Sequence, residues 1–435
     1  MTLKSHRRMR ISAKFGALRD LWPAILAGVI VIVSCSAVAT RGVIATAGGS
    51  DQKAFHLPSV VYLRDAYPEI DIAEMRTATG PLYHMLVAAP SRLFHLTVPQ
   101  MQIAGSFFGA VLVTLAVWFS RKISNSYHRV LAVAPLLFSA YFWESSLWML
   151  TDDTANLFAF GAFLIIMSGT DTRRQITSGL LIAAAIATRQ TFVWTIAPVC
   201  ASTLYALRSS PIAERIFALT RLSAPGLIVL SFLIISWGGL TPPAGRGNAA
   251  SISPAAISFA FAQTGVFAIP IVIALVDGNS VDKRTRFAAI VGIVVALPAI
   301  LFPTSPTTPP DDSRRGGAIW SIASISPNIM NRSLLLIALA FFGGAAATIL
   351  YFELSRQLAI LLATGLFSVA LVSVAVSQLF QKYFEIPISL FAVIAIVSLY
   401  SAGRIVRNWP LLLLAVLQAS VTIGIVAIPI LRSWS

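Results

Sequence analysis

The sequence contains little charge. Of its 435 residues, 11% are Asp, Glu, Lys or Arg, whereas 57% are hydrophobic. A water-soluble chain of this length has about a quarter of its residues charged, so the composition excludes an ordinary soluble enzyme. Uncharged runs of about 17–25 residues recur along the chain, and that length crosses about 30 Å of hydrocarbon. The sequence therefore predicts an all-α, polytopic membrane protein.

The chain also lacks the patterns of several other protein classes. It has only two cysteines, Cys35 and Cys200, and both lie inside hydrophobic runs, where they are most simply core residues. It has no HExxH, Walker A, GxSxG or zinc-ligand spacing. Acids are scarce, and the net charge is +15. The basic residues form no continuous stripe but separate the hydrophobic runs, which is typical of membrane topology and not of nucleic-acid binding.

The uncharged runs predict about thirteen transmembrane helices. Residues 1–21 form a basic segment, expected to be a cytoplasmic tail followed by a retained first helix. With this orientation, most Lys and Arg lie inside and most acids outside. The expected spans are 22–40, 100–120, 130–147, 154–170, 176–188, 191–207, 222–241, 255–276, 287–303, 333–352, 358–379, 386–402 and 409–431.

The longest external loop is predicted at 41–99. We expect it to contain two interfacial helices, near 55–66 and 80–95, because treating the second as a span would place a basic cluster outside. A mild change in composition near residue 222 divides the chain into an N-terminal transmembrane module at 22–222, with an acidic external face, and a more apolar C-terminal module at 223–435. No internal repeat is visible.

Ionisable residues gather in four stretches that this topology brings to the external face. They are residues 51–56 (DQKAFH), the acids between residues 65 and 74, residues 143–153 (WESSLWMLTDD), and two helix ends, 188–194 (TRQTFVW) and 381–387 (QKYFEIP). A carboxylate can deprotonate a hydroxyl group, and cations can stabilise a departing phosphate. The pattern therefore favours transfer from an anionic lipid. Simpler explanations are open too: solvated loop acids, a helix cap at Asp152 or Asp153, and an interfacial Arg189.

In order, these stretches resemble the dolichyl-phosphate-glucose-dependent alpha-1,2-glucosyltransferase family of the GT-C superfamily. The similarity covers about residues 50–390. The family motif Asp-Glu-x-Phe-His-x-Pro is similar to 51–58 (DQKAFHLP), with one extra residue here, and Thr-Thr-x-Pro-Gly-Leu-Tyr is similar to 77–83 (TATGPLY). Tyr-Tyr-Thr-Asp/Glu is similar to 149–152 (MLTD). Arg-Gln-Thr-Asn-x-x-Trp is similar to 189–194 (RQTFVW) at Arg189, Gln190, Thr191 and Trp194, with Phe192 in place of the Asn and one residue fewer before the Trp. Arg-Tyr-x-x-x-Pro is similar to 382–387 (KYFEIP), where Lys382 replaces the arginine.

The resemblance implies a GT-C fold and an inverting glycosyltransferase. A hexose, expected to be glucose, would move from a polyprenyl-phosphate donor to a lipid-linked or envelope glycan acceptor, in contact with membrane lipids. The implied setting is a bacterial inner membrane, with the N-terminus cytoplasmic and the active site periplasmic. No cofactor or metal is predicted, although the superfamily includes metal-dependent members. The implied roles are Asp51 as the base, Arg189, Lys382 and His56 at the donor phosphate, and Asp152, Asp71, Gln190, Tyr383 and Tyr83 at the sugar or acceptor, with Asp152 as the alternative base.

Two other functions compete with this one. A transporter or lipid-linked sugar flippase also has many spans, but it more typically shows inverted repeats and charges near the bilayer midplane. A polymerase or ligase of envelope polysaccharide usually has its main external loop later in the chain. The long first loop and the one-sided charges favour the transferase.

Overall fold

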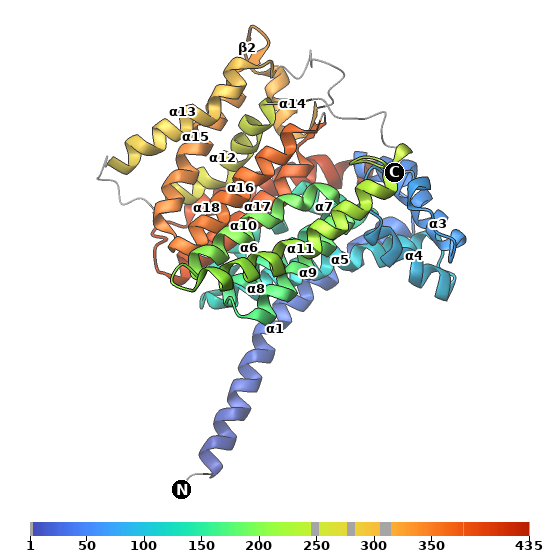
Figure 1. Cartoon of the computed structure of the whole chain (residues 1–435), viewed down its shortest axis with the longest axis horizontal. Coiled ribbons are helices and arrows are strands. Elements are labelled where there is room, and N and C mark those ends of the chain that lie inside the picture. Colours follow the sequence, from blue (N-terminus) through green and yellow to red (C-terminus); the bar gives the residue numbers. More distant parts are fainter. Residues whose placement is uncertain (1–2, 245–251, 276–282, 305–314, 377, 435) are drawn as a thin grey trace.

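The computed structural model describes residues 3–244, 252–275, 283–304, 315–376 and 378–434 (Figure 1). The first half consists of α1 (Leu3–Ala39), α2 (Ala47–Asp51), the π-helix η1 (Gln52–His56), α3 (Leu57–Ala66), η2 (Ile72–Glu74), α4 (Leu82–Phe94), α5 (Val98–Phe119), η3 (Ser120–Lys122), α6 (Ser126–Leu137), α7 (Ala140–Leu147), α8 (Asp152–Ser168), α9 (Thr172–Thr188), η4 (Gln190–Thr195), α10 (Ile196–Ala206) and α11 (Ile212–Trp237). The second half consists of α12 (Ala255–Leu275), α13 (Lys283–Leu301), β1 (Arg315–Gly316), α14 (Ala318–Ile325), β2 (Asn328–Ile329), β3 (Arg332–Ser333), α15 (Leu334–Glu353), α16 (Arg356–Val374), β4 (Leu379–Phe380), α17 (Lys382–Ser401), α18 (Trp409–Thr422), η6 (Ile423–Ala427) and α19 (Ile428–Arg432).

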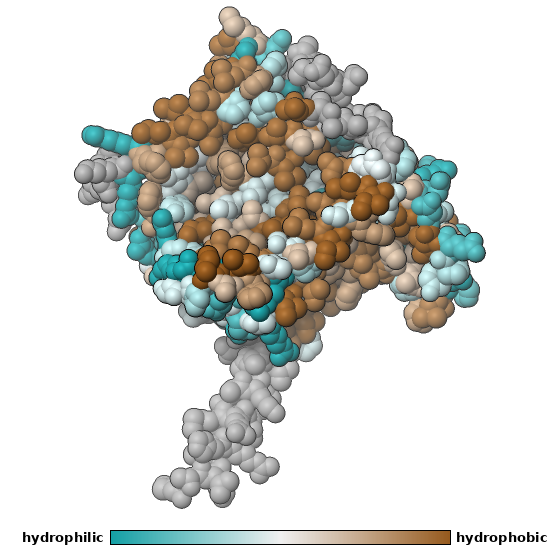
Figure 2. Space-filling model, in the orientation of Figure 1, coloured by the Kyte–Doolittle hydropathy of each residue, from teal (hydrophilic) through white to brown (hydrophobic). Residues whose placement is uncertain are grey.

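The predicted all-α polytopic membrane fold is confirmed. Within the described residues, nine helices are long and apolar enough to cross a membrane, and a bent pair raises the number to ten. The strands form two short pairs, β1 with β4 in parallel and β2 with β3 in antiparallel. Figure 2 shows apolar side chains covering the flank of the bundle, with hydrophilic ones at its lower edge and around α3 and α4.

Some predicted spans differ from the observed helices. The expected span 130–147 is broken: α6 and α7 meet at 67°, and the Ser139 hydroxyl accepts a hydrogen bond from the Phe142 N–H to begin the second helix. The helices α8 and α9 have 17 residues each, at the lower limit of the usual span length, and α10 has 11, which falls short of it. The count of thirteen stays a prediction.

The loop 41–99, which the sequence predicts to be external, is largely helical. The helices α3 and α4 occupy most of the ranges 55–66 and 80–95 expected from the sequence. The loop begins beside the C-terminus, because the Arg41 guanidinium lies 4.3 Å from the centre of the Trp434 ring. The chain end and this loop therefore share one side of the bundle, and Asp51 lies at the junction between α2 and η1 on that side.

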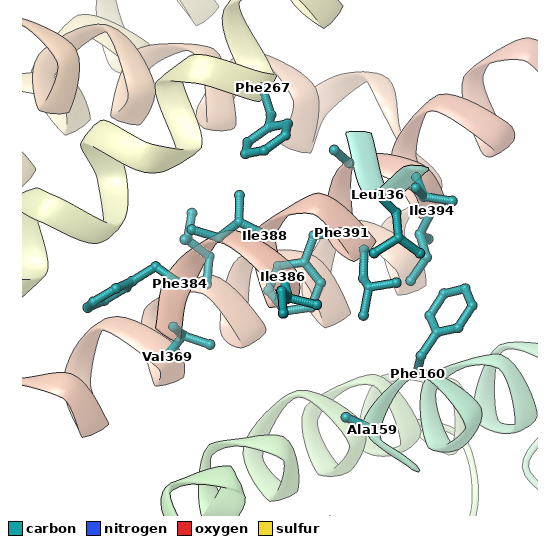
Figure 3. Packing of buried hydrophobic residues seen from close by; sticks show 14 of the residues in the cluster. Leu136, Ala159, Phe160, Phe267, Val369, Phe384, Ile386, Ile388, Phe391 and Ile394 are labelled. Atoms are coloured by element: carbon teal, nitrogen blue, oxygen red, sulfur yellow. The ribbon is translucent and has the colours of Figure 1, made fainter. Parts of the chain in front are cut away.

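Helix α17 lies in the centre of the bundle. Of its 18-residue apolar stretch, 83% is buried. Its aromatic side chain Phe391 has its ring centre 5.9 Å from that of Phe163 in α8 and 5.8 Å from that of Trp194 in η4. Figure 3 shows the α17 side chains between Phe160 of α8 and Phe267 of α12. This packing fixes the direction of α17, whose first residue is Lys382.

The crossing of α12 and α15 depends on a glycine. A Cβ atom added at Gly343 would lie 1.9 Å from the backbone oxygen of Phe261, and backbone cannot move aside as a side chain can. We therefore predict that Gly343→Ala lowers the melting temperature in detergent, at a cost of about 1–3 kcal/mol or more in the free energy of unfolding. The measurement is thermal unfolding of the purified protein.

The matched control is Gly161→Ala in α8, where the added Cβ would meet only a leucine methyl group at 3.4 Å. It should leave stability unchanged or raise it slightly, because alanine favours the helix. Equal melting temperatures for the two variants would contradict the close approach of α12 and α15.

Candidate active site

Two adjoining cavities lie at the loop side of the bundle. Their volumes are about 290 and 300 Å³, and they share a wall that contains Asp152, Arg189, Lys382 and Tyr383. The first, the apolar cavity, is lined mainly by hydrophobic side chains of η4, α11, α16 and α17: Phe192, Val193, Trp194, Leu230, Val369, Val372 and Phe384. The second, the polar cavity, is lined by charged and polar side chains that include Asp51, His56, Arg76, Tyr141 and Glu144. Charged groups therefore separate an apolar compartment from a polar one.

Asp51 and Lys382 form the first ion pair of this wall. The Lys382 ammonium donates a hydrogen bond of 2.6 Å to Asp51 Oδ2, although 330 residues lie between them in the chain. Asp51 ends α2, and Lys382 begins α17. The Lys382 side chain is 19% exposed and that of Asp51 is 32% exposed, so the pair lies largely inside the protein. Such a pair is costly to break because the remaining charge would lack a partner.

A π turn follows Asp51. It spans Gln52–His56, the segment in which this chain has one residue more than the family motif. A π turn closes its hydrogen bonds over five residues instead of four, so it accommodates one residue more than an α turn. As a result, both Asp51 and His56 reach the polar cavity. The role of Asp51 stays a prediction.

Asp152 and Arg189 form the second ion pair. The Arg189 guanidinium donates a charge-assisted hydrogen bond to Asp152 Oδ1, and the two side chains are 12% and 9% exposed. The guanidinium also lies 4.7 Å from the centre of the Tyr383 ring, at a distance suited to a cation–π contact. The N-cap of α8 is Thr151, so Asp152 does not cap the helix. Arg189 is buried in the wall.

His56, His84 and the Gly80 carbonyl form a chain of hydrogen bonds in which the donor of each bond can be assigned. His84 Nδ1 lies 3.3 Å from the Gly80 carbonyl oxygen, which can only accept, so this nitrogen carries the proton. Neutral His84 then accepts at Nε2 from His56 Nδ1, 2.9 Å away, and the imidazole planes are stacked. His56 Nε2 is left as an acceptor. Neutral His56 therefore presents no cationic donor to a phosphate, unlike the role that the resemblance implies.

Burial keeps both histidines neutral. It lowers the pKa of His56 well below its usual range, and the neighbouring His84 and the positive charges of Lys382 and Arg189 act in the same direction. Burial lowers the pKa of His84 to about 4, although its hydrogen bond to Gly80 opposes this. Desolvation disfavours the charged form of an imidazole, so the direction follows from the environment.

The polar cavity contains a carboxylate that our sequence analysis did not single out. Glu144 of α7 is 6% exposed, and its Oε1 accepts a hydrogen bond of 3.3 Å from the Gly48 N–H. It lies in the stretch 143–153 that was predicted to reach the site, but only Asp152 was chosen from it. The break between α6 and α7 places Glu144 at this cavity, and the hydrophobic pattern contains no signal for that bend.

A buried hydrogen-bond network lies next to the wall, at the start of α17. Glu385 accepts hydrogen bonds from Ser139 at 2.6 Å and from the Gln381 amide at 2.8 Å. Gln381 in turn accepts a hydrogen bond of 2.8 Å from the Ile319 N–H of α14. This network joins α7, α14 and the start of α17, so it holds the helix end that carries Lys382.

Of three further residues predicted to contact the sugar or acceptor, two lie outside the two cavities and one lines the apolar cavity. Asp71 is exposed and accepts a hydrogen bond of 2.8 Å from the Ala73 N–H. Tyr83 is fully buried in a hydrophobic cluster with Met75 and Met101. Neither lies among the described residues that line the two cavities. Gln190 lines the apolar cavity, but its amide donates to two backbone carbonyls, Ala78 at 2.8 Å and Leu240 at 3.1 Å.

The site contains acids but no evident metal centre among the described residues. No group of three or more His, Cys, Asp or Glu side chains in that part of the chain is placed to hold a metal ion. The absence of a metal stays a prediction.

Comparisons with known proteins assign the chain to no family. No protein-family model and no curated protein sequence matches the chain. Among solved structures, it is similar to the crystal structure of ArnT from Cupriavidus metallidurans in the apo state, with 13% identity and a TM-score of 0.35. That similarity covers 90% of this chain and 78% of the ArnT chain.

The buried histidines predict an acid-sensitive fold. Below about pH 6.5 the unfolded chain binds protons at His56 and His84, whereas folded His84 binds one only near pH 4, so stability falls between these values. One such histidine contributes up to about 1.4 kcal/mol per pH unit. We expect His84→Gln to flatten the dependence of the melting temperature on pH over this range.

The control for this experiment is His95→Asn, which replaces an exposed histidine of the same loop. It should keep the slope of the wild type. An unchanged slope in His84→Gln would show that other groups cause the acid sensitivity.

Proposed function

We propose that the chain is an inverting membrane glycosyltransferase of the GT-C type. It would transfer a hexose, with glucose as the first candidate, from a polyprenyl-phosphate donor to a lipid-linked or envelope glycan acceptor. The reaction would take place on the exoplasmic side, which is the periplasm if the membrane is a bacterial inner membrane. The observation that carries the proposal is the shared wall, where Asp51–Lys382 and Asp152–Arg189 separate the apolar cavity from the polar one.

The wall provides the groups that a donor phosphate needs. Lys382 supplies a compact positive charge, and Arg189 supplies a planar guanidinium held over Tyr383. Next to them, the apolar cavity offers hydrophobic side chains to the first part of a lipid tail. A phosphate at this position competes with Asp51 and Asp152 for the two cations. Donor binding would thus turn each neutralised carboxylate into a free one.

The polar cavity would hold the acceptor. Asp51 is our first candidate for the base that takes the proton from the attacking hydroxyl, and Asp152 is the alternative. Single displacement needs one base and good alignment of two substrates. His56 Nε2 and Glu144 offer hydrogen-bond acceptors for other hydroxyl groups of the glycan. Tyr383 and Gln190 stay candidates for sugar contacts, whereas we assign no substrate contact to Asp71 and Tyr83.

The first test is transfer by the purified protein in lipid. The assay follows labelled polyprenyl-phosphate glucose, then other hexoses, into an envelope-lipid extract by mass spectrometry. We predict that Asp51→Asn lowers the transfer rate about 10²–10⁴-fold while donor binding persists, because the base is lost. Arg189→Ala should weaken donor binding itself, since a buried cation that contacts the phosphate is removed.

Asp71→Asn is the matched control, because it neutralises an exposed acid of the same loop. It should keep wild-type activity. Full activity in Asp51→Asn with loss in Asp152→Asn would assign the base to Asp152. Absence of transfer and donor hydrolysis by the wild type, across the panel of lipid-phosphate sugars, would contradict the proposed activity and favour a transporter.

A further inference from the structure

Helix α7 presents two polar side chains to the polar cavity. Tyr141 and Glu144 both line it, and the two residues are 7% and 6% exposed. They are three positions apart in the helix, so their side chains are neighbours on its surface. In the reaction proposed above Glu144 offers a hydrogen-bond acceptor, whereas Tyr141 has no role. The hydrogen bonds of both residues indicate what they can bind together.

The Tyr141 hydroxyl is a donor with no acceptor of its own. Its oxygen accepts a hydrogen bond of 3.0 Å from the Ala318 N–H at the start of α14. A backbone N–H can only donate, so the phenol keeps its proton for another partner. Tyr141 makes no second hydrogen bond within the part of the chain that the structure describes. The proton is therefore available to a ligand in the polar cavity.

Two other helices hold α7 in place. Gly317, directly before α14, has φ of +125°, and a Cβ atom there would lie 2.6 Å from the Tyr141 oxygen and 2.4 Å from Gln381 Cβ. At the start of α7, the Ser139 hydroxyl donates a hydrogen bond of 2.6 Å to Glu385 of α17. The position of Tyr141 is thus fixed by packing before any substrate arrives, which lowers the entropy that binding must cost.

Glu144 complements this donor with an acceptor. Its Oε1 accepts from the Gly48 N–H, whereas its Oε2 has no hydrogen bond to the other described residues. A sugar hydroxyl both donates and accepts, so two neighbouring hydroxyl groups can use Tyr141 and Glu144 at once. A phosphate or carboxylate group can only accept, so it could use Tyr141 but would find no donor in the Glu144 carboxylate. The pair therefore favours a neutral, hydroxylated ligand.

We propose that Tyr141 and Glu144 recognise the acceptor, and that the sugar they hold is a neutral one. Tyr141 would donate to the oxygen of one hydroxyl group, and Glu144 would accept from a second. Asp51 lines the same cavity and would take the proton of a third hydroxyl group, the attacking one. This inference rests on the proposed transfer reaction, and it gives the acceptor of that reaction a chemical class. Both residues bind the acceptor and take no part in the donor site.

The test separates binding of the acceptor from binding of the donor. The envelope-lipid extract is varied at saturating labelled polyprenyl-phosphate glucose, and the donor Kd is measured without the extract. We expect Tyr141→Phe and Glu144→Gln each to raise the KM for the extract about five- to tenfold, which corresponds to about 1–1.4 kcal/mol for one hydrogen bond. The kcat and the donor Kd should change little, because ground state and transition state lose the same contact.

Fragmentation of the labelled product by mass spectrometry identifies the sugar that receives the hexose. We expect a neutral sugar with free hydroxyl groups. A uronic acid or a phosphorylated sugar at this position would overturn the inferred acceptor class.

Tyr62→Phe is the matched control, because it also removes a tyrosine hydroxyl that bonds to the main chain, at the Asp71 carbonyl 3.0 Å away. Tyr62 is not among the described residues that line either cavity, so the variant should keep the wild-type KM. Thermal unfolding of each variant separates loss of fold from loss of binding.

The outcomes distinguish this inference from the proposed function. If the wild type transfers no hexose, the proposed function fails and this inference fails with it. If the wild type is active and Tyr141→Phe and Glu144→Gln keep its KM for the extract, the inference alone is overturned. An equal rise in KM in Tyr62→Phe would also overturn it, because a general weakening of the loop side would then explain the result.

Discussion

Two ion pairs inside an apolar bundle organise this structure. A charge that is removed from water without a partner is strongly destabilising, so Asp51, Asp152, Arg189 and Lys382 can lie in the interior only together. They come from the end of α2, the start of α8, the end of α9 and the start of α17. Their pairing therefore fixes how four separate segments meet. The central helix α17 supports this arrangement, because its buried length keeps Lys382 at the site.

The same pairs mark a boundary between two environments. On one side are the hydrophobic side chains of the apolar cavity, and on the other are the acids and the histidine of the polar cavity. A substrate with a lipid tail and an anionic head matches this boundary, and an acceptor with hydroxyl groups matches the polar side. Because the two cations are paired with the two carboxylates, these four groups carry no net charge. An arriving phosphate would exchange partners with the carboxylates instead of meeting bare charges.

The opposite end of α17 carries charges that are less deeply buried. There the arginines lie near helix ends and are partly exposed, as Arg284 and Arg404 are at 58% and 54%, and both pair with Glu353. Solvent lowers the cost of an unbalanced charge at such a position, whereas a buried charge needs a fixed partner. One helix thus begins at a buried cluster of ion pairs and ends near a partly exposed one.

The sequence by itself determined the class of the fold, the long first loop with its two helices, and most of the residues in the wall. Hydropathy and charge are properties of short segments, so spans of apolar residues and the acids and bases between them are visible without a structure. The motifs also indicated Asp51, Asp152, Arg189 and Lys382 as residues of the site. Only the tertiary structure decided that Asp51 meets Lys382 and that Asp152 meets Arg189. It also broke the span 130–147 to bring Glu144 inward, left Asp71 at the surface, and buried Tyr83 in the core. These outcomes depend on how helices far apart in the chain pack against each other, and local residue patterns do not encode that geometry.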